Sequence, residues 1–348
     1  MRTLLKTNFR RYFTHPLLWA GLLFSAFLGF TTGHGFLREY TKHNTLYMNL
    51  DDIIFMFALF AQSVVLAVLI TSQHKNGIFR SKVIAGKSKG KIFLAELLTG
   101  LTVSVLHYVL LMGPVFLLAK PIIRMIPLRN TLAGAGSLLL IFLIIAALTV
   151  LLCSQMRGSI LSLMLCLGGV FLLYAANYFS DDALHTPEKL TVTLKLTDDD
   201  AAPSATYESR KSGRLMLVQL PKTSGVHWSE DGIMVGKDGK PVNHNGEPLE
   251  ENEDPIQREY LNPKYIGGPL RTILSITDCL NPIRPMNDAM HQFYYAKSAD
   301  TTDDMLKEDE KFREMRFQTL PQYLPWQLGT FALFTVGGWL LFRKKELN

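Results

Sequence analysis

The stretch IAGKSKGKIF, residues 84–93, contains the residue types that bind phosphate groups. Gly86-Lys87-Ser88 matches the end of a P-loop, in which backbone amides and a lysine surround the phosphates of a nucleotide. That loop requires a further glycine where this chain has Ser81. It must also follow a sheet strand, whereas a long apolar run precedes this stretch. We therefore exclude a nucleotide site here.

Basic residues are dense in this segment, and no acidic residue interrupts them: Arg80, Lys82, Lys87, Lys89 and Lys91. A nucleic-acid surface would spread basic and aromatic residues over a fold, but this is a short loop between two apolar runs. Two interpretations stay open. The lysines either follow the positive-inside rule and contact lipid headgroups, or they belong to a helix that docks a soluble partner.

The order of residues within the loop favours a docking helix. Asn76-Gly77 permits a turn, Gly86 is expected to end a short helix, and Ser88 is expected to cap the next one. The apolar contacts of this short helix would come from Ile78, Phe79, Val83 and Ile84. Arg80, Lys82 and Lys87 would alternate around it.

Catalytic and metal-binding patterns are scarce. The chain has no HExxH, no Cys-x-x-Cys and no G-x-S-x-G. His227 and His244 are isolated histidines in a turn-rich region, which is a weak signal for a metal site. The acids from Asp198 to Asp200 lack the glycine and the distal glutamate of a calcium loop. We predict neither an enzyme nor a metal or cofactor bound by this chain.

Several polar residues lie inside the apolar runs, where burial in lipid would be costly. The candidates for an intramembrane polar path are Gln62, Ser104, His107 and Asn177. His107 fits a functional role or helix packing equally well. Glu96 lies about one turn inside its run and is expected to pair with a nearby lysine.

Composition places the chain in a membrane. Of its 348 residues, 48% are hydrophobic and 19% are charged, whereas soluble domains carry roughly a quarter charged residues. Runs of about 20 apolar residues match the thickness of a bilayer core. Six of them occur: Leu17–Phe36, Ile53–Gln73, Ile92–Ala119, Thr131–Ser154, Ser159–Phe179 and Pro325–Phe342. We predict an α-helical integral membrane protein with six transmembrane helices.

The distribution of Lys and Arg sets the orientation of these helices. Residues 1–16 read as an amphipathic helix in the membrane interface, and both this segment and the loop 75–91 are strongly basic. The two short loops on the other side carry fewer basic residues, so both termini are predicted to lie in the cytoplasm. The net charge of +6 therefore reflects topology and does not indicate nucleic-acid binding.

Between the fifth and sixth predicted spans, residues 181–323 have a different, acidic composition. TVTLKLT, residues 191–197, alternates like a strand, and Asp231-Gly232, Asp238-Gly239 and Asn245-Gly246 are turn signals. Pro269–Leu280 resembles an amphipathic helix, and Asp303–Arg316 a solvated one. We predict a β-containing extracytoplasmic domain over 181–323, after a membrane part over 17–180. The sixth helix and a basic tail would occupy 324–348.

At this level of detail a family resemblance appears. NGIFRSKVIAGKSKGKIF, residues 76–93, resembles the loop after the second span in permease subunits of bacterial ABC exporters. The matching residues are Gly77, Arg80, Lys82, Gly86, Ser88, Ile92 and Phe93. Lys89 stands where an arginine is usual, which keeps the charge but loses the planar fork. NPKYIGGPLR (262–271) and GGWLLFRKKELN (337–348) resemble other parts of the family, whereas Thr191–Glu259 has no counterpart.

The resemblance implies a six-span exporter subunit in the bacterial cytoplasmic membrane, with an interfacial N-terminal helix and a large outer loop. Its coupling helix would dock into a separate ATPase through Gly77, Phe79, Arg80, Lys82, Gly86, Ser88 and Lys89. Two ATPase copies would bind ATP and Mg²⁺, and a second permease, identical or related, would complete the transporter. A peptide, an antibiotic or a lipid-like compound would be the substrate. The alternatives are a sensor or resistance module that detects an extracellular peptide or antibiotic, and, ranked lower, a membrane-embedded enzyme.

Overall fold

The computed structural model describes the chain except for residues 44–45, 157, 187–188, 195–203, 209–214, 220–226, 229–233, 236–256, 262–264, 298–302 and 346–348. The chain divides into two compact units. The first comprises Met1–Asn177 and Cys279–Asn348, and the second comprises Tyr178–Asp278. Residues 279–323, which we predicted to belong to the outer domain, thus pack with the first unit.

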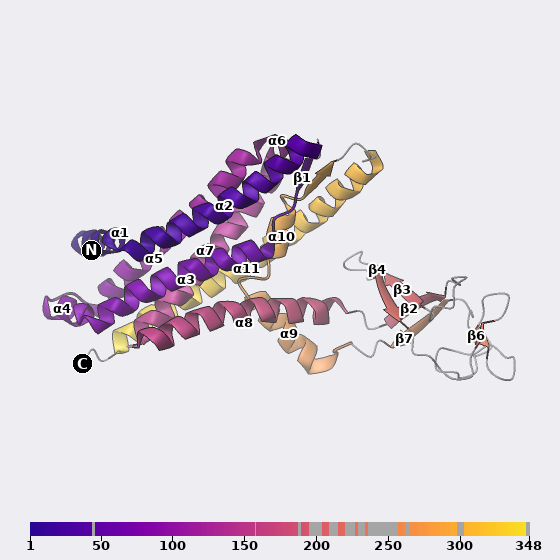
Figure 1. The fold of residues 1–348 in the computed structure, drawn as a ribbon. Helices are drawn as coiled ribbons and strands as arrows, with labels where there is room; N and C mark the ends of the chain where they lie inside the picture. The colour runs from indigo at the N-terminus through magenta and orange to yellow at the C-terminus, as the bar shows by residue number, and fades with distance from the viewer. Residues whose placement is uncertain are drawn as a thin grey trace. The chain divides into compact units, whose positions relative to one another are not determined.

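The first unit is a helical bundle (Figure 1). Its long helices are α2 (Pro16–His43), α3 (Asp52–Lys75), α5 (Lys89–Leu118), α7 (Leu128–Gln155), most of α8 (Ser159–His185) and α11 (Asp303–Lys344). Its shorter elements are α1 (Arg2–Thr14), α4 (Ile78–Ile84), α6 (Lys120–Ile123), α10 (Met286–His291), β1 (Leu46–Met48) and β8 (Tyr295–Lys297). The two strands pair antiparallel, with Tyr47 opposite Ala296.

Five helices of the described residues are long and apolar enough to cross a membrane: Pro16–Thr41, Asp52–Lys75, Lys89–Leu118, Leu128–Gln155 and Ile160–Ser180. The structure therefore agrees with a multi-pass α-helical membrane protein. The C-terminal half of α11 is not among these five. Pro321 and Pro325 lie inside this one helix, so the charged segment from Asp303 and the apolar segment are continuous.

Close helix packing explains why the bundle forms. Gly29 on α2 faces the backbone of α5, where an added Cβ would collide with the carbonyl oxygen of Leu111. Small residues allow helices to approach this closely in lipid. Fully buried apolar side chains from α3, α5 and α7, such as Leu66, Val103 and Ile145, fill the interior. The long helices thus pack through side chains that the sequence places on their inward faces.

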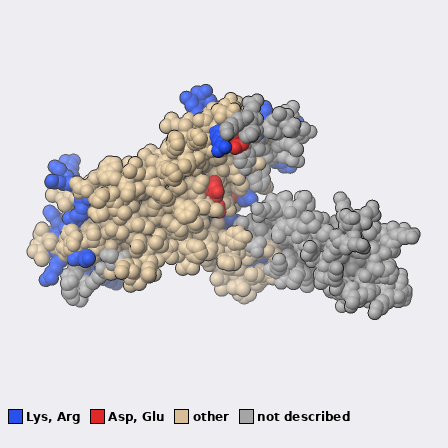
Figure 2. Space-filling view, viewed as in Figure 1, with Lys and Arg blue, Asp and Glu red and all other residues tan. Residues whose placement is uncertain are grey.

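The surface of this unit separates charge from apolar area. Figure 2 shows Lys and Arg at both ends of the bundle, the end that carries α1, α4 and the end of α11 and the opposite end near α6, with a mostly uncharged surface between them. Large apolar side chains are exposed on the outer helices, for example Leu23 on α2, Leu172 on α8 and Leu333 on α11. Such a surface suits lipid contact along the middle of the bundle.

The second unit begins in the last turns of α8 and contains short strands. β4 (Leu215–Gln219), β3 (Ser204–Glu208), β2 (Lys189–Leu194) and β7 (Gln257–Leu261) form an antiparallel sheet in that order. β5 (His227–Trp228) pairs with β6 (Met234–Val235). The strand predicted at 191–197 overlaps β2, whereas the three predicted turns lie outside the described residues. α9 (Gly268–Leu280) agrees with the predicted amphipathic helix.

Candidate functional site

The loop between α3 and α5 forms the predicted turn, helix and turn. Gly77 adopts a left-handed conformation with φ of 66° immediately before α4, and Gly86 does so with φ of 75° after it. The backbone N–H of Gly86 donates to the carbonyl of Val83 at 2.9 Å, which ends the helix. Ser88 occupies the N-cap position of α5, but its hydroxyl makes no capping bond, so that part of the prediction was wrong.

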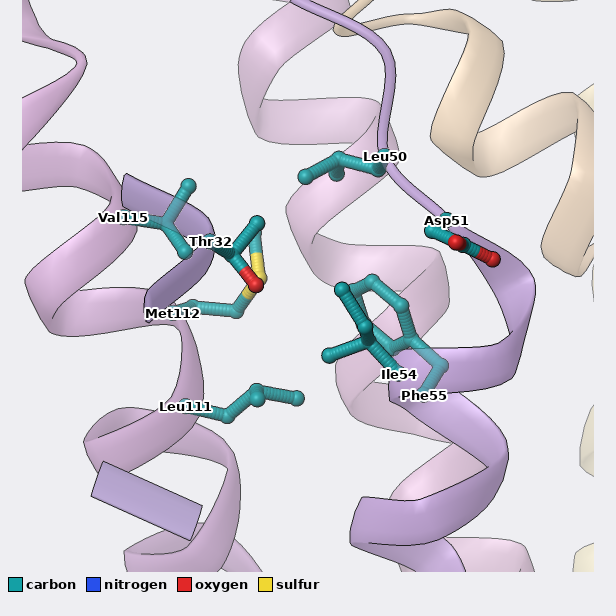
Figure 3. Close-up of a pocket in the computed structure, with 8 residues that line it drawn as sticks. All are labelled: Thr32, Leu50, Asp51, Ile54, Phe55, Leu111, Met112 and Val115. Atoms are coloured by element: carbon teal, nitrogen blue, oxygen red, sulfur yellow. The ribbon is translucent and has the colours of Figure 1, made fainter. Parts of the chain in front are cut away.

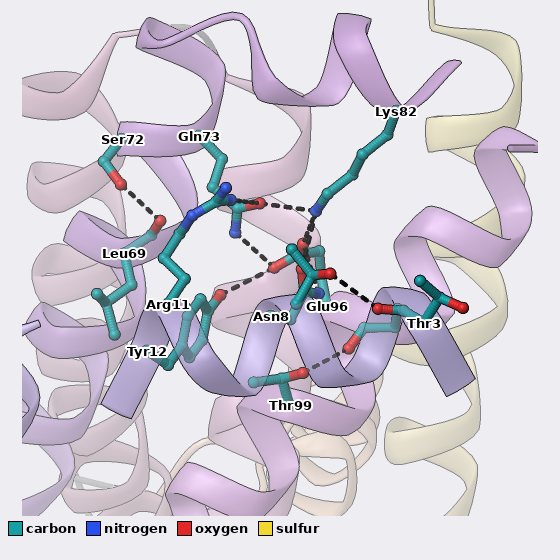
Figure 4. A network of polar contacts seen from close by, with 12 residues as sticks. Thr3, Asn8, Arg11, Tyr12, Leu69, Ser72, Gln73, Lys82, Glu96 and Thr99 are labelled. Atoms are coloured by element: carbon teal, nitrogen blue, oxygen red, sulfur yellow. Dashed lines mark hydrogen bonds and ion pairs between the residues drawn. The ribbon is translucent and has the colours of Figure 1, made fainter. Parts of the chain in front are cut away.

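Beneath α4 lies a buried ion pair (Figure 4). The ammonium nitrogen of Lys82 is 2.8 Å from Oε1 of Glu96 on α5, and the two side chains are 9% and 1% exposed. The same nitrogen donates to Oδ1 of Asn8 at 2.9 Å and to Oε1 of Gln73 at 2.8 Å. An ammonium group has three protons, and each has an acceptor here.

The carboxylate of Glu96 is equally well satisfied. Oε1 also accepts from Nδ2 of Asn8 at 2.7 Å, and Oε2 accepts from Tyr12 Oη at 2.9 Å and from Gln73 Nε2 at 2.8 Å. Burial, reinforced by the charge of Glu96, raises the pKa of the Tyr12 phenol well above its usual value. The phenol therefore stays protonated and keeps donating to the carboxylate.

This buried polar cluster joins four helices: α1 through Asn8 and Tyr12, α3 through Gln73, α4 through Lys82 and α5 through Glu96. Burying two charges is expensive, and the mutual attraction offsets that cost only when the remaining hydrogen-bonding capacity is also used. Because the cluster satisfies both groups, it fixes one position of α4 relative to its neighbours.

An aromatic cluster holds the other inward side chain of α4. Phe79 is 2% exposed, and its ring centroid is 4.3 Å from that of His74 on α3 and 5.5 Å from that of Phe342 on α11. Phe342 also contacts Phe93 of α5, with centroids 6.0 Å apart. The Lys82 ammonium lies 5.2 Å from the Phe79 ring, so the polar and aromatic clusters adjoin each other.

The last turn of α11 is tied to the same loop. Lys89 Nζ donates to the carbonyl oxygen of Lys345, and Lys345 Nζ donates to the carbonyl oxygen of Ser154 at 2.7 Å. His74 Nε2 lies 3.1 Å from that same oxygen of Ser154. These bonds connect the ends of α3, α7 and α11 around the start of α5.

The predicted coupling residues therefore divide by position. Phe79 and Lys82 point into the protein, Lys89 bonds to the end of α11, and Gly77 and Gly86 shape the turns. The exposed side chains are Arg80, Ser81, Ile84, Lys87 and Ser88, and Ile84 is 77% exposed although it is apolar. A docking surface on α4 would consist of this outer set, whereas Lys82 supports it from within.

Sequence reasoning missed Asn8, Tyr12 and Gln73 as parts of this site. Asn8 lies one turn from both Leu4 and Tyr12, so a single polar residue on the apolar face of α1 was the available signal. Gln73 was a second signal, because an uncharged polar residue there ends an apolar run beside a cluster of cations. The predicted pairing of Glu96 with a nearby lysine is confirmed.

The predicted intramembrane polar path is not continuous. Ser104 donates to Gln62 Oε1 at 3.0 Å, and Gln62 Nε2 donates to the carbonyl of Phe142 at 3.0 Å. His107 Nδ1 lies 2.8 Å from Ser25 Oγ, while its Nε2 is buried without a hydrogen-bond partner. The hydrogen bonds of Gln62, Ser104 and His107 do not reach Asn177, which is buried on α8. These bonds join α2 to α5 and α3 to α5 and α7.

Figure 3 shows a small pocket at the far end of α5, between α2, α5 and the start of α3. Its volume of about 10 Å³ holds roughly one water molecule. Its lining consists of Thr32, Leu50, Asp51, Ile54, Phe55, Leu111, Met112 and Val115. It is too small for a transported compound.

Metal chemistry finds no support in the part of the chain that the structure describes, since no group of three His, Cys, Asp or Glu residues could hold an ion there. His244 and Asp198–Asp200 lie outside the described residues. Comparison of the chain with protein-family models, curated proteins and solved structures finds no match.

Proposed function

We propose that the chain is the membrane-spanning permease subunit of an ATP-driven ABC exporter, and that α4 is the docking element for a separate cytoplasmic ATPase. The two-sided character of α4 carries this proposal. Its outer face offers Arg80 and the exposed apolar Ile84 to a partner. Its inner face is fixed by the Lys82–Glu96 ion pair and by Phe79. A short helix whose inner face makes buried contacts and whose outer face is exposed is suited to be displaced by a docked partner.

The contacts beneath α4 supply the route by which a displacement of α4 would reach the membrane helices. A displacement of Lys82 must move or break its bonds to Glu96, Gln73 and Asn8, which lie on α5, α3 and α1. ATP binding would shift the permease only if the ATPase has different affinities for two arrangements of this cluster. A second arrangement would have to re-pair these charges, because intermediate positions leave them buried and unpaired.

The topology of this proposal has six spans. The C-terminal half of α11, from Pro325, is the sixth span, and α1 lies in the membrane interface. The end that carries α1, α4 and the end of α11 faces the cytoplasm of a bacterium, because its segments 1–16 and 75–91 hold more Lys and Arg than the short loops at the opposite end. The unit Tyr178–Asp278 is then extracytoplasmic.

The transporter would contain a second permease, identical or related, and two ATPase copies that bind ATP and Mg²⁺. The substrate would be a peptide, an antibiotic or a lipid-like compound. A path for substrate would form between the two permeases.

The first test is the neighbouring reading frame, which should encode an ATPase with a complete P-loop. Co-purification with that ATPase and ATP hydrolysis in nanodiscs then test the pairing. Arg80→Glu reverses a charge on the outer face of α4, and Ile84→Asp replaces an exposed apolar side chain with a charged one. Neither residue belongs to the buried cluster, so both variants should abolish complex formation. Lys120→Glu, an equally exposed charge change at α6, is the matched control and should leave the complex intact. Unchanged assembly and ATP-dependent efflux in both α4 variants would refute the docking assignment and favour a sensor module.

A further inference from the structure

Helix α9 exposes large apolar residues, whereas its charged residues Asp278 and Arg271 are buried and half-buried. Leu270, Ile273 and Ile276 are 54%, 59% and 52% exposed. Their spacing of three residues places them on one stripe of the helix. A helix in water normally shows the opposite arrangement, with its apolar stripe against a core. The stripe therefore needs a partner of its own.

Polar contacts hold α9 in this orientation. Asp278 is 6% exposed and accepts a hydrogen bond of 2.6 Å from Ser180 Oγ. Arg271 donates to the carbonyl oxygens of Leu184 at 2.7 Å and Ile266 at 3.3 Å. These bonds lie on the side opposite Ile273, so the outward direction of the stripe is fixed by the fold and does not result from a loose helix.

The anchor point of α9 lies at the limit of a membrane-length helix. Ser180, which bonds to Asp278, is the last residue of the apolar segment Ile160–Ser180. Tyr178 and Phe179 precede it and are 77% and 71% exposed. Aromatic side chains of this kind are enriched where a helix leaves the hydrocarbon region. The Ser180–Asp278 bond thus holds α9 near the level of the membrane surface.

We propose that α9 is a membrane-surface helix whose apolar stripe of Leu270, Ile273 and Ile276 contacts lipid. The stripe enters the boundary between headgroups and acyl chains, at a depth of roughly 5–10 Å. Lipid is the favoured partner because the Ser180–Asp278 hydrogen bond joins α9 to the end of a membrane-length helix, close to the exposed Tyr178 and Phe179. A protein partner could bind the stripe at any distance from the membrane, so it would not require α9 to lie at the membrane surface. This inference depends only on the chain being a membrane protein and is independent of ATPase docking.

The test uses the full chain in phosphatidylcholine–phosphatidylglycerol nanodiscs that contain one copy each. Cys153, Cys166 and Cys279 are replaced by alanine, and a single cysteine is introduced as Ile273→Cys, Ile276→Cys or Ser275→Cys. Ser275 is exposed on the side of α9 opposite Ile273, so it is the matched control. Each cysteine carries a polarity-sensitive fluorophore, and the lipids carry a spin-label quencher either near the headgroup or deep in the acyl chain.

The expected result is blue-shifted emission from labels at 273 and 276, quenched more strongly by the shallow spin label than by the deep one. The label at 275 should emit as in water. Two results would overturn the proposal. One is water-like emission at 273 and 276. The other is a label shielded from aqueous iodide but unaffected by either lipid quencher, which indicates protein contact. Reading two stripe positions protects the test against one variant that fails to fold.

Discussion

Lys82 on α4 and Glu96 on α5 form an ion pair of 2.8 Å that is closed off from solvent by Asn8 and Tyr12 of the N-terminal helix. The pair therefore connects a surface loop to a membrane-length helix through a third element. Removing Lys82, Glu96 or Tyr12 leaves different buried groups without a hydrogen-bond or charge partner. The following variants separate the contribution of each residue to stability.

Replacing one member of the ion pair should destabilise the protein more than replacing both. Lys82→Met or Glu96→Leu leaves one buried charge without its partner and should cost about 3–5 kcal/mol. The double variant Lys82→Met/Glu96→Leu removes both charges and should be more stable than either single variant. Thermal unfolding in detergent measures all three. Additive losses in the double variant would contradict a coupled pair.

Tyr12→Phe should loosen α1 without disturbing its packing, because only the hydroxyl is removed. A hydrogen bond to a charged group contributes about 1.5–3 kcal/mol, and the lost bond is to the Glu96 carboxylate. Hydrogen exchange should rise in both α1 and α4, since the cluster links them. Tyr178→Phe, an exposed position, is the control and should leave exchange in both helices unchanged.

The Tyr12 contribution also has a defined pH dependence. Burial raises the pKa of its phenol above the usual 10.0. A group whose pKa is higher in the folded state than in the unfolded state stabilises the fold fully at pH values below the unfolded-state pKa. That stabilisation is lost as the pH rises through the folded-state pKa. The Tyr12→Phe protein should therefore lose less stability than the parent protein between neutral and strongly alkaline pH. Parallel alkaline denaturation curves for the two proteins would contradict this prediction.

Gly77→Ala and Gly86→Ala test the turns on either side of α4. Nothing lies within 4 Å of an added Cβ at either position, so the penalty comes from the left-handed backbone alone. It should be about 1–2 kcal/mol per site. Gly136→Ala is the matched control, because its Cβ position is equally open but lies within α7. That change should be neutral or slightly stabilising by the same thermal measurement.

Gly29→Ala tests the close approach of α2 to α5. The added methyl group would meet the carbonyl oxygen of Leu111, and such overpacking should cost about 1–3 kcal/mol. Gly35→Ala lies on the same helix with open space around it and should be tolerated. Equal stability of the two variants would show that α2 and α5 are not packed as described.

The sequence predicted the elements well where one residue type decides the outcome. Apolar length alone identified the long helices, and Gly77 and Gly86 marked the ends of α4, because few other residues adopt those backbone angles. The sequence analysis treated the charged segment Asp303–Arg316 and the apolar run from Pro325 separately, whereas the structure joins them in one helix. α11 continues through both prolines, since the preceding residues of this helix already form its first turns.

The buried cluster could not be predicted as a whole. Lys82 lies among several cations of one loop, and only the orientation of α4 decides which of them points inward. That orientation depends on Phe79 meeting Phe342, a residue more than two hundred positions away. Local patterns contain no information about such a contact. The division of 181–323 between two units escaped prediction for the same reason.

The contact of Phe342 with Phe79 and Phe93 also has a consequence for biosynthesis. The ribosome makes α11 after the α4 loop, so the inner face of α4 acquires its final packing only after residue 342 has been synthesised. A truncated chain ending before residue 342 would carry α4 without this support.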